Sequence, residues 1–149
     1  MGAEPYWYFE KYEGNVAVAL KALREREFAA GRYNPVIASM WRLFPIGPNS
    51  PAPGAQHASI DEAREDAAED GTRSILDLDH TAEEPDFCAV APLPDSVLKD
   101  LYGTTQPTRA MVEDNMDFME EMERGQGVYI ILYQEGHPNE VFFAGFSFD

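Results

Sequence analysis

Two aspartates and a threonine lie at alternate positions in residues 73–81, which read RSILDLDHT. In this spacing the first carboxylate, of Asp77, can attack a phosphorus atom, while the second, of Asp79, can act as acid and base. Carboxylate oxygens are also ligands of Mg²⁺, and Thr81 adds a hydroxyl group beside them. One interpretation of the string is therefore the nucleophile segment of a Mg²⁺-dependent phosphohydrolase.

The stretch SILDLDHT resembles the first motif of the haloacid-dehalogenase-type phosphatases. The resemblance implies a nucleophilic Asp77, an acid/base Asp79 and a following hydroxyl from Thr81, with Mg²⁺ held by the two carboxylates. It also implies a parallel, doubly wound sheet in which this motif lies on the first strand. Later segments would then supply a serine or threonine after a second strand, a lysine that neutralises the phosphate, and an acidic pair for the metal ion.

The rest of that pattern is missing from the sequence. Only 68 residues follow Thr81, and the single lysine among them, Lys99, falls inside an expected helix. The chain also closes with an expected antiparallel hairpin, whereas parallel strands need long crossover connections. The sequence therefore favours a non-catalytic interpretation, in which a strand over 73–80 points Asp77 and Asp79 toward solvent from a half-buried edge.

Other residues that could carry chemistry are scattered. His57, His80 and His137 have no spacing typical of metal ligands, and one cysteine cannot build a zinc site. Cys88 lies in the apolar stretch DFCAV, which favours a buried and unreactive thiol. The glycines form neither a dinucleotide-binding nor a phosphate-binding fingerprint. We therefore expect no metal site and no cofactor, and an enzyme is the less favoured class.

The charge of the chain is strongly negative and uneven. The 149 residues include 27 acidic and 11 basic residues, which gives a net charge of −16. Residues 59–123 alone hold 19 acidic and four basic residues, whereas residues 1–58 are close to neutral. Such a field repels nucleic acid and anionic lipid surfaces and attracts basic proteins. The charge thus favours a basic protein partner and argues against nucleic acid and membranes.

The acidic residues gather on two expected helices, 59–71 and 107–124. Ser59 and Glu62 form a capping-box pattern at the start of the first helix. The polar faces of the two helices make the candidate interaction surface, which comprises Asp61, Glu65, Asp66, Glu69, Asp70, Glu113, Asp117 and Glu120. This surface predicts a non-enzymatic protein-binding or regulatory module, such as a bacterial immunity protein or antitoxin that neutralises a basic toxin.

A third interpretation is a small-molecule-binding domain with an aromatic pocket. Aromatic residues near a proline-rich loop can line such a pocket. The candidates are Tyr6, Trp7, Tyr8, Trp41 and Arg42. Aromatic packing in the core explains the same residues, so this alternative stays open beside the protein-binding interpretation.

Helix and strand signals predict the order of the elements. Alternating aromatic residues favour a strand over 6–13, and Asn15 can cap a helix that Gly31 ends. Within that helix Glu27 falls on the apolar face. A carboxylate there is either a functional acid or, as we favour, a residue near a fraying helix end that pairs with Arg24 or reaches water. The final strands, GVYIILYQ and VFFAGFSF, are apolar on both faces, which predicts central places in the sheet.

These signals together predict one α+β domain over residues 1–149 with a mostly antiparallel sheet. The sheet would combine the N-terminal strand, two strands within 73–92 and the C-terminal hairpin, and three to four helices would pack around it. Four prolines and two glycines predict a flexible loop over 45–57.

The sequence also favours a cytoplasmic protein. The chain has one cysteine, no apolar run of the length that a spanning helix needs, and no basic-then-apolar signal at its start. No pattern in the sequence predicts an oligomeric state.

Overall fold

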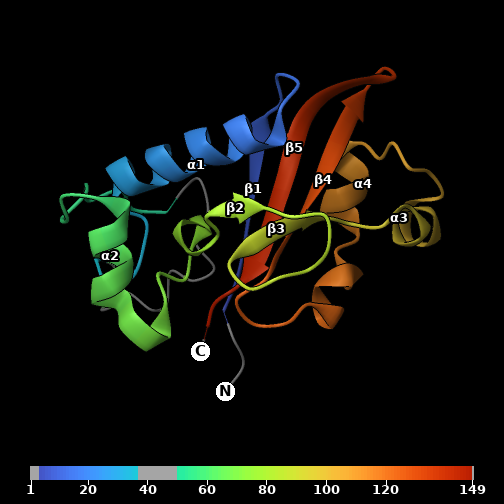
Figure 1. Cartoon of the computed structure of the whole chain (residues 1–149). Helices are drawn as coiled ribbons and strands as arrows, with labels where there is room; N and C mark the ends of the chain where they lie inside the picture. The colour runs from blue at the N-terminus through green and yellow to red at the C-terminus, as the bar shows by residue number, and fades with distance from the viewer. Residues whose placement is uncertain (1–3, 37–49, 149) are drawn as a thin grey trace.

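The centre of the molecule is a five-stranded mixed sheet with the strand order β1-β5-β4-β3-β2 (Figure 1). The computed structural model describes residues 4–36 and 50–148. The strands are β1 (Pro5–Lys11), β2 (His80–Thr81), β3 (Ala89–Pro92), β4 (Gly127–Gln134) and β5 (His137–Phe146). β5 pairs antiparallel with β1 and β4, whereas β3 pairs parallel with β2 and β4. The expected α+β domain is confirmed, but the antiparallel prediction holds only for the half of the sheet that β1, β5 and β4 form.

Four α-helices flank this sheet in the described part of the chain: α1 (Val16–Ala30), α2 (Ile60–Ala67), α3 (Asp95–Tyr102) and α4 (Arg109–Asp114). α1 begins where predicted because the Asn15 side chain accepts a hydrogen bond from the Val18 N–H at 3.1 Å. α2 also begins at its predicted cap, where Ser59 accepts from the Glu62 N–H at 3.1 Å. Both caps satisfy N–H groups that have no partner within the helix.

The C-terminal hairpin occupies the middle of the sheet, as its two-sided apolar pattern predicts. A two-residue turn, Glu135 and Gly136, joins its strands with φ values of 52° and 80°, which are typical of tight hairpins. Phe142 and Phe143 are both fully buried although they point to opposite faces. The central strands are therefore covered by packing on both sides.

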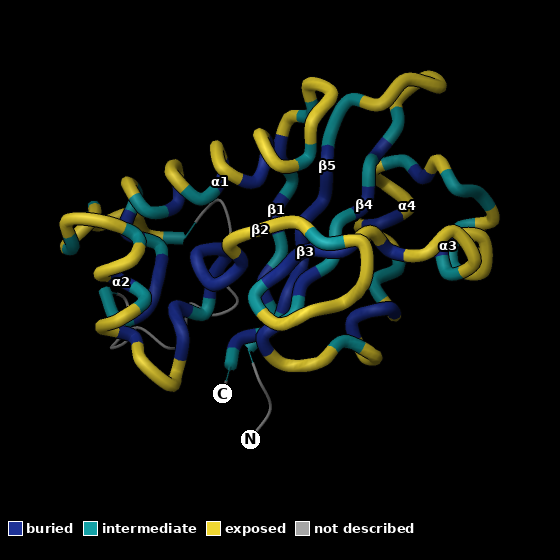
Figure 2. Tube along the Cα trace, viewed as in Figure 1, coloured by how far each residue is buried: buried dark blue, intermediate teal, exposed yellow. Residues whose placement is uncertain are grey.

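Two apolar cores cover the two faces of the sheet. On one face Tyr8 and Phe143 pack with α1 and with the buried residues around position 76. On the other face Ile130 and Phe142 pack with α3, α4 and the residues that follow α4. Figure 2 shows the buried residues concentrated in the strands, with exposed residues along the outer turns of α1 and α2. The sheet thus forms the middle of three layers.

The helix predicted over 107–124 is wrong in its second half. α4 stops early, and a separate 3₁₀ helix, η4, spans Asp117–Glu121. Asn115 breaks the helix because its backbone has an extended φ of −146° and its side chain accepts a hydrogen bond from the Asp117 N–H at 3.0 Å. The Tyr102 hydroxyl donates to the Asn115 carbonyl at 2.6 Å, which fixes the break against α3.

The strand predicted over 73–80 is also wrong. Its first part forms a 3₁₀ turn, η3 (Ile75–Asp77), and only two residues pair with the sheet as β2. Ser74 starts the turn by accepting a hydrogen bond from the Leu76 N–H at 3.2 Å. The alternation of an extended strand would expose part of this segment, whereas the turn fully buries three of its apolar side chains, those of Ile75, Leu76 and Leu78.

Residues 50–57 contain no helix or strand, in keeping with the predicted loop, while residues 45–49 lie outside the described part of the chain. The loop is held against the end of α1, where Gly54 donates its N–H to the Ala30 carbonyl at 2.9 Å. Gly31 ends α1 with a φ of 76°, and a Cβ atom there would overlap the Gly54 carbonyl oxygen. Position 31 therefore needs glycine both for its backbone angle and for this contact.

Candidate functional site

The strand interpretation predicted Asp77 in solvent, and this prediction is wrong because Asp77 lies inside the protein. It is 1% exposed. The Thr72 N–H lies 2.9 and 3.1 Å from its two carboxylate oxygens, and the Thr72 hydroxyl donates to one of them at 2.8 Å. Burial raises the pKa of Asp77, and the hydrogen bonds from Thr72 oppose that shift. Asp77 thus closes the loop that leads into η3, and both of its oxygens are engaged there.

Asp79 and Thr81 are exposed at the surface. Asp79 accepts a hydrogen bond from Arg64 at 2.8 Å and contacts the His80 ring nitrogen at 2.6 Å. Burial raises the pKa of Asp79, but hydrogen bonds from Arg64 and His80 outweigh it and hold the pKa below its usual value. The two aspartates therefore bind different partners. Within residues 4–36 and 50–148, no three acidic, histidine or cysteine side chains converge as ligands of one metal ion would.

Cys88 precedes β3 and is partly exposed, so the prediction of a buried thiol within a strand is wrong. Its backbone has a left-handed φ of 64°. Its sulfur lies 3.6 Å from a guanidinium nitrogen of Arg64. Burial raises the pKa of the thiol more than the Arg64 charge lowers it, so the protonated thiol predominates at neutral pH.

The predicted acidic surface divides into two. All eight carboxylates are exposed, but α2 and the segment from α4 to η4 lie on opposite sides of the sheet in Figure 1. The α2 acidic face carries Asp61, Glu65, Asp66, Glu69 and Asp70, and the η4 acidic face carries Glu113, Asp117 and Glu120. Asp66 pairs with His57 at 2.9 Å, and Glu113 pairs with Arg109 at 3.0 Å. A partner that makes one compact contact can therefore bind only one of these two faces.

A groove with an apolar lining and an acidic rim lies near η4. Its cavity volume is about 420 Å³. The apolar lining comes from β3, α3, η4 and β4 and the residues next to them, and it includes Leu93, Val97, Phe118, Met122 and Val128. Three exposed carboxylates line the same groove, those of Glu83, Glu84 and Glu121. We call this feature the acidic-rimmed groove.

None of the three rim residues belongs to the predicted interaction surface. Glu83 and Glu84 lie in the loop that joins β2 to β3. A parallel pair of neighbouring strands usually needs a connection of a dozen or more residues, but here residues 82–88 suffice because β2 contributes only two residues to the sheet. The available signal was the acidic pair directly before Pro85, which marks an exposed loop.

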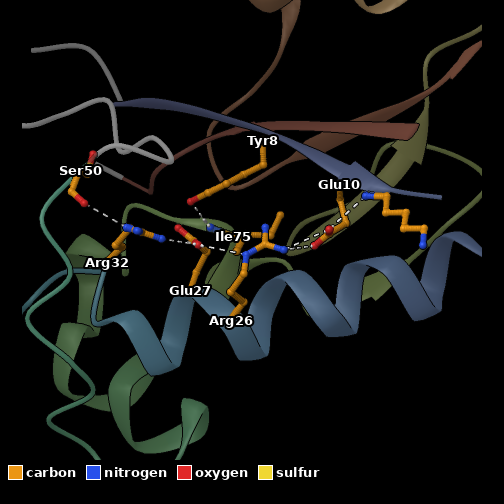
Figure 3. A network of polar contacts seen from close by, with 8 residues as sticks. Tyr8, Glu10, Arg26, Glu27, Arg32, Ser50 and Ile75 are labelled. Atoms are coloured by element: carbon orange, nitrogen blue, oxygen red, sulfur yellow. Dashed lines mark hydrogen bonds and ion pairs between the residues drawn. The ribbon is translucent and has the colours of Figure 1, made fainter. Parts of the chain in front are cut away.

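Glu27 lies at the centre of a polar network between β1 and α1 (Figure 3). It is 2% exposed, so the prediction that it reaches water or a fraying helix end is wrong. One of its oxygens, Oε2, accepts a hydrogen bond from Arg32 at 3.0 Å and lies 3.7 Å from Nε of Arg26. Arg24, the predicted partner, instead donates to the Leu76 carbonyl at 2.8 Å.

Each arginine of this network has a second partner, as Figure 3 shows. Nη1 of Arg26 lies 2.7 Å from Glu10 on β1. Nε of Arg32 donates to the Ser50 carbonyl at 3.1 Å. The Arg32 side chain is only 17% exposed, so the end of α1, the loop at position 50 and Glu27 hold its guanidinium in place.

The second oxygen of Glu27, Oε1, has no hydrogen-bond partner among the described residues. Burial raises the pKa of Glu27, and the charges of Arg32 and Arg26 oppose that shift. The nearby Tyr8 hydroxyl accepts from the Ile75 N–H at 3.3 Å, and its pKa is raised by burial and by the Glu27 charge. Most buried polar atoms in proteins are hydrogen-bonded, so Oε1 stands out within this network.

A cavity of about 550 Å³ opens along the network, and we call it the arginine cavity. Among the described residues, its charged lining consists of Arg26, Glu27, Arg32 and Arg109, and its aromatic lining consists of Trp7, Tyr8 and Phe9 on β1. The Arg109 guanidinium also lies over the Phe9 ring, 4.0 Å from the ring centroid. The cavity thus combines three guanidinium groups, one buried carboxylate and the aromatic side chains of β1.

Two of the five residues predicted for an aromatic pocket, Trp7 and Tyr8, line the arginine cavity. Tyr6 is fully buried in the core beneath α1, and Trp41 and Arg42 lie outside the described residues. The charged lining was not predicted. Its signal was the stretch REREFAAGR over residues 24–32, in which a glutamate on the apolar helix face has arginines one and five positions away.

No protein-family model, no curated protein and no solved structure matches this chain. Among the residues that the structure describes, no helix combines the length and the apolar character needed to cross a bilayer. Geometry and charge therefore carry the functional proposals.

Proposed function

We propose that the protein is a non-enzymatic binding module for a basic protein partner. The observation that carries this proposal is the acidic-rimmed groove. Its apolar lining offers burial to apolar side chains, while Glu83, Glu84 and Glu121 offer carboxylates to lysine or arginine on the same partner. A partner segment that carries both basic and apolar residues would match both properties.

The charge of the whole chain supports the same class of partner. A net charge of −16 attracts basic proteins over a distance and repels anionic ones. The α2 acidic face lies on the other side of the sheet from η4 (Figure 1). In this proposal that face adds to the attraction, whereas the groove makes the contact.

The placement of the Asp77 and Asp79 side chains supports a non-enzymatic class. The oxygens of Asp77 accept hydrogen bonds from Thr72, and Asp79 is paired with Arg64. Each carboxylate oxygen of the two residues therefore already has a partner within the protein. We therefore propose a cytoplasmic regulatory module, of which a bacterial immunity protein or antitoxin directed at a basic toxin is one form.

Affinity capture with two matched charge-reversal variants tests this proposal. The groove variant carries Glu83→Lys, Glu84→Lys and Glu121→Lys, and the control variant carries Asp61→Lys, Glu65→Lys and Glu69→Lys on the α2 acidic face. Both variants change the net charge equally, so they differ only in where the change lies. Captured basic proteins are identified by mass spectrometry, and their affinity for each variant is measured at about 50 and about 500 mM salt.

We expect the wild type and the control variant to bind the same basic protein, more weakly at high salt because of screening. The groove variant should bind it about 100-fold or more weakly, because like charges then face each other at the contact. An equal loss in both variants would mean that general charge and not the groove determines binding. The lack of any salt-sensitive basic partner would overturn the proposal.

A further inference from the structure

We propose that the arginine cavity binds a small zwitterion of the α-amino-acid type, with its carboxylate at the arginines and its amino group at Glu27. The cavity volume of about 550 Å³ falls within the range of about 300–1,000 Å³ that is typical of small-molecule sites. Its lining residues differ from those of the acidic-rimmed groove. This inference therefore stands or falls independently of the basic protein partner.

Guanidinium groups are concentrated in this cavity, and each of them is paired with at least one carboxylate. The sequence has only 11 basic residues, yet Arg26, Arg32 and Arg109 all line the cavity. A guanidinium group presents five N–H donors in a fixed plane, which matches the geometry of a carboxylate. Among the described residues, partners contact Nε and Nη1 of each of these arginines. No partner of their Nη2 groups is found among the described residues, and we assign these donors to the bound carboxylate.

Glu27 supplies the complementary charge for an amino group. Its Oε2 is held by Arg32 and Arg26, while its buried Oε1 has no hydrogen-bond partner among the described residues. A buried acceptor without a donor is unfavourable. An ammonium group carries three N–H donors, and one of them placed at Oε1 would complete the hydrogen bonding of Glu27. A simple carboxylate anion, which carries no amino group, would leave this oxygen without a donor.

The aromatic lining favours an apolar side chain on the ligand. Trp7 and Phe9 are partly buried and line the cavity, and they pack with the core on the sheet face opposite α1. The Phe9 ring already contacts the planar Arg109 guanidinium, and both residues line the cavity. An apolar or aromatic amino acid would place its charged end at the guanidinium groups and its side chain against these rings.

A purely structural network explains the ion pairs but not the unpaired oxygen. The contacts of Arg26 with Glu10 and of Arg32 with Glu27 link α1 to β1 and to the loop at position 50. A structural network of this kind normally satisfies each of its buried oxygens. Asp77 in the same protein shows that arrangement. An N–H donor from a ligand would give Oε1 of Glu27 the hydrogen bond that the structural network does not supply.

Isothermal titration calorimetry with three matched probes tests the inference. The probes are L-phenylalanine, 3-phenylpropanoate, which lacks the amino group, and phenethylamine, which lacks the carboxylate. For a ligand of this size we expect L-phenylalanine to bind with a Kd of about 1 mM or tighter. Each truncated probe should bind about tenfold more weakly or worse, because one charged side of the site then stays unpaired.

Two variants place the binding in the cavity, and a third is a matched control. Glu27→Gln keeps the size of the side chain and should weaken L-phenylalanine about tenfold while leaving 3-phenylpropanoate unchanged. Arg109→Gln should weaken both probes that carry a carboxylate. Arg64→Gln, which removes an arginine outside the cavity lining, should change neither.

Circular dichroism and thermal unfolding establish that each variant is folded before its affinity is measured. If Glu27→Gln is not folded, Arg109→Gln and the three probes with the wild type still decide the question. The inference is overturned if no probe binds the wild type saturably. It is also overturned if L-phenylalanine binds folded Glu27→Gln or Arg109→Gln as tightly as it binds the wild type.

Discussion

Two carboxylates are almost completely buried among the described residues, and they differ in their hydrogen bonds. Asp77 is 1% exposed and Glu27 is 2% exposed. Both oxygens of Asp77 accept hydrogen bonds from Thr72, whereas only one oxygen of Glu27 has a partner among the described residues. Asp77 belongs to a string that resembles a catalytic motif, and Glu27 belongs to a helix without any motif.

This difference teaches that hydrogen-bond saturation, more than a sequence motif, separates a structural carboxylate from one that can bind a ligand. A saturated carboxylate stabilises its own loop and has little capacity left for a substrate. Burial raises the pKa of both Asp77 and Glu27, so the direction of the pKa shift does not distinguish them. The neighbouring side chains distinguish the two carboxylates, because Glu27 shares a cavity with three arginines.

The largest effect on stability is expected for Asp77→Ala. The variant leaves the Thr72 N–H and the Thr72 hydroxyl without their acceptor in a buried position. We expect the free energy of unfolding to fall by about 3 kcal/mol, and urea denaturation measures it. An unfolding midpoint equal to that of the wild type would contradict the structural role of Asp77.

A smaller loss is expected for Gly31→Ala, which disturbs the anchoring of the Glu27 network. An alanine must keep a φ of 76°, and its Cβ would overlap the Gly54 carbonyl oxygen. We expect a loss of about 2 kcal/mol in the free energy of unfolding. Gly14→Ala is the control, because a Cβ at its φ of 97° meets nothing within 4 Å. Equal losses in thermal unfolding would mean that the contact with Gly54 contributes nothing.

The pH dependence of Glu27→Gln tests the burial of this carboxylate. Burial raises the pKa of Glu27 above its usual value of 4.5, so ionised Glu27 lowers the stability of the folded protein. This loss develops as the pH rises through and above 4.5. Glu27→Gln cannot ionise, and its stability should therefore increase relative to the wild type between about pH 3 and pH 7. Urea denaturation across this range checks the sign, and a difference that stays constant or decreases would contradict it.

The smallest effect, with the opposite sign, is expected for Asp79→Asn. The pKa of Asp79 is held below its usual value of 3.8, so its ion pair stabilises the protein above that pH and is lost as the pH falls below it. Because the side chain is 41% exposed, solvent screening limits this contribution to less than about 1 kcal/mol. Asp79→Asn should be less stable than the wild type at neutral pH and equally stable in acid. Equal stability at both pH values would show that the pair contributes nothing.

Elements with local signals could be predicted from the sequence. Asn15 and Gly31 mark the ends of α1 through their own backbone contacts. The C-terminal strands are apolar on both faces, which required a central place in the sheet. The segment 73–80 could not be predicted in this way, because its alternating pattern fits a strand. The hydrogen bonds of Ser74 decide in favour of a turn instead.

The candidate site could be predicted only in part. Trp7 and Tyr8 were recognised as pocket residues from their aromatic character. Arg109 was not, because it lies 77 residues after Arg32 in the sequence and reaches the cavity only through the contact of its side chain with Phe9 on β1. The sequence predicts that water or Arg24 reaches Glu27. It does not show that the Ser50 carbonyl holds Arg32, which then pairs with Glu27.

An NMR titration of the arginine Nε–H signals with L-phenylalanine tests the central claim most directly. We expect the signals of Arg26, Arg32 and Arg109 to shift together and to saturate, because their guanidinium groups line the cavity. The signal of Arg64, which lies outside the cavity and pairs with Asp79, should stay in place. Equal shifts at Arg64, or the lack of a saturable shift at the three cavity arginines, would contradict the claim that the unsaturated carboxylate marks the binding site.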